Sequence, residues 1–130
     1  MFQRSVLDNQ LRVLTSTMPH TRSVSIVICV GAGSRYEPED KAGLSHFLEH
    51  LPFKGTKDWP TAKAVSEAIE GVGGVMNAST DREMTAFWCK VAQPHFKTAF
   101  SVLLDMLINP LLDPEELEKE REVIQEELRM

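Results

Sequence analysis

Residues 42–53 read AGLSHFLEHLPF, and this stretch decides how the rest of the chain is interpreted. Its apolar residues recur at the spacing of an α-helix: Leu44, Phe47, Leu48 and Leu51. We therefore predict a short, largely buried helix over this stretch, with Pro52 and Gly55 marking its end.

Three ionisable side chains lie on the predicted helix: His46, Glu49 and His50. Residues four apart share one face, so the two imidazoles can bind a single metal ion. Glu49 lies about 60° around the helix from His46, so its carboxylate can reach a water on that ion without binding the ion itself. Zn²⁺ suits this set of donors. The alternative is a helix with two incidental histidines, but burying three ionisable groups is costly unless something pairs with them.

The remaining periodicity predicts an α+β domain in which helices cover a mostly antiparallel sheet. Strands are predicted over residues 11–17, 23–30, 75–80 and 84–91, and further helices over residues 61–70, 94–109 and 113 onward. No repeat or linker divides the chain, so we expect a single domain over residues 1–130. The last helix has no stop signal, which suggests that this domain is truncated.

Composition excludes several classes of protein. Hydrophobic residues make up 42% and charged residues 25%, which is typical of a folded globular domain. The net charge of −5 and the lack of a basic face argue against a nucleic-acid partner. No apolar run is long enough to span a membrane. We expect a cytoplasmic protein, or one of the mitochondrial matrix or periplasm that has lost a targeting segment. Cys29 and Cys89 lie in apolar runs and are expected to be buried, reduced thiols.

The final predicted helix offers a third metal ligand. If Ile124 marks the centre of its apolar face, Leu128 falls within about 40° on one side, and Glu120 and Glu127 fall about 40° and 60° to the other. Glu126 points to solvent, so helix phase favours Glu127 as the buried ligand. Two solvated acids at the helix border are the alternative, and phase alone does not separate these interpretations.

The sequence resembles the pitrilysin/insulinase family of zinc metallopeptidases, whose His-x-x-Glu-His order is the inverzincin signature. Collinear blocks extend this resemblance over nearly the whole chain: residues 33–37, 43–50, 53–56, 77–83 and 120–127. The bacterial processing-protease branch, related to the β subunit of the mitochondrial processing peptidase, is the most similar. One departure is Leu51-Pro52, where the proline is expected to shift the exit of the helix. The resemblance implies a pitrilysin-like half-domain.

The resemblance also implies roles for individual residues. One Zn²⁺ per chain is expected on His46, His50 and Glu127, with Glu49 as the general base. Glu120 is expected to orient a ligand or a water without binding the metal. Extended substrate is expected to add as a strand along the sheet edge at Asn77 and Ala78. Phe53 is expected either to line the pocket near the metal or to belong to the core.

These expectations describe a zinc-dependent endopeptidase acting on extended peptides or presequences. Family members are much longer than 130 residues, and their second half closes over the substrate. We therefore expect two partners, a peptide or unfolded-protein substrate and a missing C-terminal half or partner subunit. An incomplete domain would expose an apolar surface where the missing half belongs, so self-association into a homo-oligomer is the alternative. The alternatives are a non-catalytic scaffold subunit, or an incomplete domain that binds zinc but needs the second half for activity.

Overall fold

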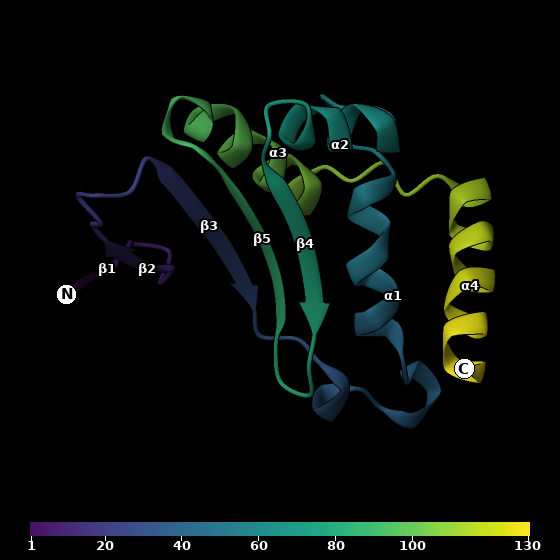
Figure 1. Ribbon diagram of the computed structural model, residues 1–130. Coiled ribbons are helices and arrows are strands. Elements are labelled where there is room, and N and C mark those ends of the chain that lie inside the picture. The colour runs from purple at the N-terminus through teal and green to yellow at the C-terminus, as the bar shows by residue number, and fades with distance from the viewer.

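The computed structural model describes residues 1–130 and contains two antiparallel sheets and four α-helices (Figure 1). The larger sheet has the strand order β3 (Ser23–Val30), β5 (Thr85–Ala92) and β4 (Val75–Thr80), so β5 is central and β4 is an edge strand. The predicted α+β class with helices on an antiparallel sheet is therefore confirmed.

Alternation along β5 separates the two faces of the sheet. Thr85, Phe87, Cys89 and Val91 are buried, while the residues between them are half-buried or exposed. Two helices, α2 (Ala62–Glu70) and α3 (Phe96–Ile108), cover the buried face. Nine buried residues form the core that they share: Val65, Ile69, Phe87, Cys89, Val91, Ala99, Val102, Leu103 and Met106.

The other two helices stand beside the free edge of β4. Helix α1 (Leu44–His50) lies between β4 and α4 (Pro114–Arg129), as Figure 1 shows. The chain leaves α1 through a 3₁₀ turn, η3 (Leu51–Lys54), because Pro52 has no N–H to continue the α-helical pattern. The α-helix is accordingly shorter than the predicted stretch of residues 42–53.

The prediction that this helix is largely buried is wrong. No residue of α1 is buried, and Leu44 and Leu48 are 42% and 47% exposed. The helix packs against β4, α4 and the 3₁₀ turns on either side of it in the chain, and residues of α1 also line two open cavities. Leu48 lines one cavity and Leu44 lines the other, so both side chains keep contact with solvent.

Asp113 caps the start of helix α4, because its side chain accepts hydrogen bonds from the N–H groups of Glu115 and Glu116 at 2.9 and 3.3 Å. Ile124 and Glu120 are its buried residues, as the helix phase indicates. Leu128 was placed on the same face but is 76% exposed, because the groove it borders beside α1 is open.

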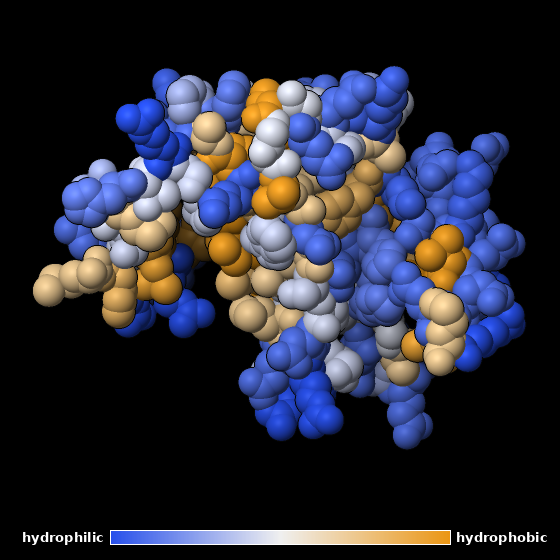
Figure 2. All heavy atoms as spheres, viewed as in Figure 1, coloured by the Kyte–Doolittle hydropathy of each residue, from blue (hydrophilic) through white to orange (hydrophobic).

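Strand β1 (Phe2–Val6) pairs with β2 (Arg12–Ser16) in a separate hairpin, and β1 was not predicted from the sequence. Cys29 is exposed on the uncovered face of the sheet, so the prediction of two buried thiols holds for Cys89 alone. Apolar residues reach the surface over the three-stranded sheet, whereas the α4 region is mainly hydrophilic (Figure 2). None of the helices has the length and apolar character that crossing a membrane requires.

Candidate metal centre

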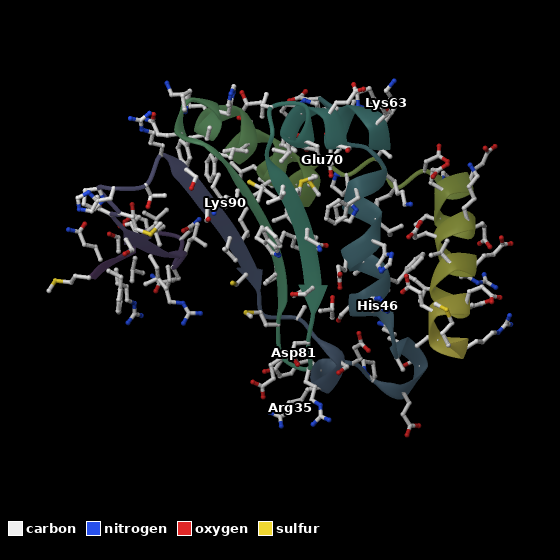
Figure 3. All side chains as sticks on the ribbon, in the orientation of Figure 1. Arg35, His46, Lys63, Glu70, Asp81 and Lys90 are labelled. Atoms are coloured by element: carbon white, nitrogen blue, oxygen red, sulfur yellow. The ribbon has the colours of Figure 1, made fainter.

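Two histidines on α1 present the same ring nitrogen to one point. His46 Nε2 and His50 Nε2 are 3.1 Å apart, and the rings meet edge to face with centroids 4.8 Å apart. Their spacing of four residues places them one turn apart on the helix face. Figure 3 marks His46 on α1 in the space between β4 and α4.

Glu127 completes the group from α4. Its Oε2 atom lies 3.5 Å from His46 Nε2 and 3.9 Å from His50 Nε2. Its side chain is 40% exposed, so the prediction of a buried carboxylate is wrong at this position, and Glu120 is the buried glutamate of α4. His46, His50 and Glu127 therefore form a group whose three donor atoms lie close enough together to bind one metal ion. The neighbouring Glu126 instead points away and pairs with Arg129 at 2.6 Å, as helix phase predicted.

The triangle of donor atoms fits a zinc ion. With sides of 3.1, 3.5 and 3.9 Å, a point equidistant from the three atoms lies about 2.0 Å from each, which is the usual zinc bond length to nitrogen and oxygen. Two neutral imidazoles and one carboxylate also match the donor set of catalytic zinc sites that keep a fourth position open.

A second carboxylate orients His50. Glu120 Oε1 lies 2.7 Å from His50 Nδ1, and its Oε2 lies 2.6 Å from the Nζ of Lys54. Burial opposes ionisation of Glu120, but the hydrogen bonds from Lys54 and His50 outweigh it and hold the pKa of this carboxyl below its usual range. An ionised carboxylate only accepts hydrogen bonds, so Nδ1 donates and Nε2 keeps its lone pair for a metal.

Glu49 is half-buried and does not belong to the converging triangle. It lines a cavity of about 310 Å³ between α1, the end of β3 and α3, whose other walls are mostly apolar. Its position about 60° around α1 from His46 lets this carboxylate accept a proton without being a metal ligand.

The loop that contains residues 33–37, for which the sequence predicted no role, holds the start of α1. Gly43, at the N-cap, offers no side chain to cap the helix, and the carboxylate of Glu37 takes that role. It accepts hydrogen bonds from the N–H groups of Gly43 at 2.7 Å and Ser45 at 2.6 Å. Hydrogen bonds from Ser45 and from the Gly43 N–H hold the pKa of Glu37 below its usual range.

The same loop is fastened to the tip of the β4–β5 hairpin. The Arg35 N–H bonds the carbonyl of Arg82 at 2.8 Å, and the Arg35 guanidinium pairs with Glu83. Figure 3 places Arg35 and Asp81 together at this tip. Gly33 packs so closely that a Cβ there would lie 2.4 Å from the carbonyl oxygen of Asp81. The loop therefore joins the edge strand to the histidine helix.

Asn77 and Ala78 lie on the edge strand β4. The Asp81 N–H donates a hydrogen bond to the Met84 carbonyl across the turn, so Asp81 and Met84 form a hydrogen-bonded pair. Hydrogen-bonded and non-hydrogen-bonded pairs alternate along an antiparallel ladder, and Ala78 with Phe87 is therefore a non-hydrogen-bonded pair. The backbone N–H and carbonyl of Ala78 accordingly point away from β5, toward the free edge. The N–H of Ala78 is held by the Asn77 side-chain oxygen at 2.8 Å. Phe53 stacks on Phe87 at 6.4 Å between ring centroids and packs against the core.

The chain was compared with known proteins. The family model described as "Insulinase (Peptidase family M16)" matches residues 12–130. An uncharacterized zinc protease of Bacillus subtilis, YmxG, is 39% identical over all of this chain and 32% of its own length. A probable β subunit of the mitochondrial processing peptidase of Arabidopsis thaliana is 38% identical over 96% of this chain and 23% of its own. The crystal structure of pitrilysin matches with a TM-score of 0.85 and 36% identity, over 98% of this chain and 14% of its own. The chain thus spans about a third or less of the relatives it matches.

Proposed function

Since this chain belongs to the insulinase family of peptidases, family M16, we propose that it carries the metal centre of a zinc-dependent endopeptidase that hydrolyses extended peptides or presequences. The observation that carries this proposal is the triangle of His46, His50 and Glu127, whose size fits one zinc ion per chain. The choice of zinc as the metal is supported by the relatives that are named zinc proteases.

Each residue of the centre has a distinct part in this proposal. His46 and His50 bind the metal through Nε2, and Glu127 binds it through Oε2. Glu120 keeps His50 in the tautomer that can bind. When bound, Zn²⁺ supplies Lewis acidity, which lowers the pKa of water and polarises a substrate carbonyl.

Glu49 is proposed as the general base. Its carboxylate takes a proton from the attacking water and passes that proton to the nitrogen of the leaving amine. The helical repeat places Glu49 next to the ligand face of α1 without making it a ligand. The cavity that it lines is open to solvent, so exclusion of water around the carboxylate is proposed to need a covering second half.

The free edge of β4 is proposed to bind the substrate backbone. An added strand hydrogen-bonds mainly through its main chain and so accepts varied sequences. Ala78 would donate its N–H to a substrate carbonyl, and Asn77 would first release that N–H. Phe53, packed against the core, would act through the shape of the site and not by direct contact.

A second half of the peptidase is proposed as the partner of this chain. The relatives are much longer, and one of them is a probable subunit of a processing peptidase. Residues of α1 line two open cavities, which a second element could cover to exclude water from the site. Activity is accordingly expected to depend on that second half.

Metal content is the first test. Elemental mass spectrometry on freshly purified protein should find about one zinc per chain, lost on dialysis against a chelator. His46→Ala and His50→Ala should each remove it, whereas His95→Ala, on a histidine outside the site, should not. A folded wild-type chain that holds no zinc would instead favour a scaffold role.

Hydrolysis is the second test. Zinc-loaded chain, alone and with the second half of a relative supplied, is given an unstructured fluorogenic peptide. Glu49→Gln should retain zinc and lose cleavage by at least about 100-fold, while Glu67→Gln on the exposed face of α2 should cleave like wild type. Unchanged cleavage by Glu49→Gln would rule out its role as base. The lack of any cleavage by the zinc-loaded wild-type chain in both settings would rule out the peptidase.

A further inference from the structure

We propose that Lys54 is a positioning residue of the metal centre, which sets zinc affinity by holding Glu120 against His50. This inference rests on the proposed metal site, because it concerns how firmly the ligands are held. Lys54 touches none of the three ligands and has no evident part in the chemical step.

A continuous chain of contacts leads from Lys54 to the metal ligands. The Nζ atom of Lys54 lies 2.6 Å from Glu120 Oε2, and Glu120 Oε1 lies 2.7 Å from His50 Nδ1. Each carboxylate oxygen therefore has its own partner, one on either side. A carboxylate held at both oxygens cannot turn about its axis, so the plane of the His50 ring is fixed with it.

Lys54 also supplies the charge that this arrangement needs. The Glu120 side chain is only 5% exposed, and a buried carboxylate is costly unless it is paired. His50 must be neutral to bind a metal, so it cannot balance that charge. Lys54 is the one lysine or arginine of the protein that pairs with Glu120.

The pair joins the two helices on which the ligands lie. Lys54 ends the 3₁₀ turn that directly follows α1, and Glu120 lies on α4, seven residues before Glu127. Seven residues are about two helical turns, so fixing Glu120 also fixes the direction of Glu127 along α4. Loss of Lys54 should therefore loosen both the His50 ring and the approach of Glu127.

Competition with a fluorescent chelator measures the zinc Kd and tests this inference. We expect Lys54→Met to raise the Kd about 10–100-fold, as loss of an outer partner of a metal ligand typically does. Lys54→Arg keeps the charge and should restore the Kd to near the wild-type value. Lys63→Met is the matched control. Lys63 pairs with Glu67 at 3.6 Å on the exposed face of α2, away from His46 (Figure 3).

A double-mutant cycle separates a positioning role from general loss of structure. If Lys54 acts through Glu120, Lys54→Met should weaken zinc binding little further in a Glu120→Gln background. Cobalt-substituted protein gives a second readout, since the visible spectrum of Co²⁺ should change in Lys54→Met and return in Lys54→Arg. Lys54→Gln replaces Lys54→Met if circular dichroism shows that the latter does not fold.

The outcomes distinguish this inference from the function on which it rests. A wild-type chain that binds no zinc overturns both. A wild-type chain that binds zinc, with an unchanged Kd in folded Lys54→Met, overturns the inference and leaves the metal site standing. An equal loss of affinity in the Glu120→Gln background also overturns it, because Lys54 would then act independently of Glu120.

Discussion

Glu127→Ala removes the proposed ligand that comes from the second helix and leaves both histidines in place. The apparent free energy of zinc binding at such sites is about 10 kcal/mol or more. If three donors share it about equally, loss of one costs about 3 kcal/mol, which raises the Kd on the order of 100-fold.

Chelator competition and thermal unfolding should agree on this value. Free zinc at a concentration of 100 times the wild-type Kd stabilises the wild-type fold by about 2.7 kcal/mol. The same concentration is about equal to the Kd expected for Glu127→Ala, so it stabilises that variant by only about 0.4 kcal/mol. For a chain of 130 residues, these free energies raise the Tm by about 10 °C and about 1–2 °C, respectively. Differential scanning calorimetry with and without zinc resolves this difference.

Glu126→Ala is the control, because the two glutamates are adjacent on α4 and only one faces the histidines. Glu126 is 68% exposed and pairs with Arg129, so its removal should change the Kd by less than about 3-fold. A wild-type Kd in Glu127→Ala, or an equal loss in both variants, would refute the assignment of Glu127.

Three further substitutions test the structure around the centre. Gly33→Ala puts a methyl group against the backbone of Asp81 and should destabilise the fold by about 1–3 kcal/mol, whereas Gly31→Ala points into open space and should not, as urea unfolding will show. Asp113→Ala removes the cap of α4 and should cost about 1 kcal/mol by the same assay. Glu37 has a lowered pKa, so its stabilising contribution is complete above the ordinary glutamate pKa and is lost as the pH falls through the folded value. The acid limb of the stability–pH profile should therefore flatten in Glu37→Gln, and an unchanged limb would contradict the capping role.

The sequence predicted those features that depend on local periodicity. The helical repeat placed His46 and His50 on one face, and helix phase separated Glu127 from Glu126, as the structure also has them. The β4–β5 hairpin followed from alternating residues and a short polar turn. These features arise within a few residues of one another, so a single sequence contains the information.

Features that depend on distant contacts were missed or misjudged. The roles of Glu37 and Lys54 depend on partners 8 and 66 residues away, respectively, and no local pattern marks such a partner. The burial of α1 was overestimated, because apolar residues at helical spacing indicate a face that can be covered but not whether an element covers it. Strand β1 was missed because all of its residues are exposed, so it lacks the apolar alternation of a half-buried strand.

The proposed metal centre joins residues made early in synthesis to one made late. His46 and His50 leave the ribosome well before Glu127, which follows 77 positions after His50. A nascent chain that lacks α4 presents two imidazoles and no carboxylate, so it should hold zinc only weakly. Stable zinc binding at the proposed site is therefore expected only after α4 has been made and has docked beside α1.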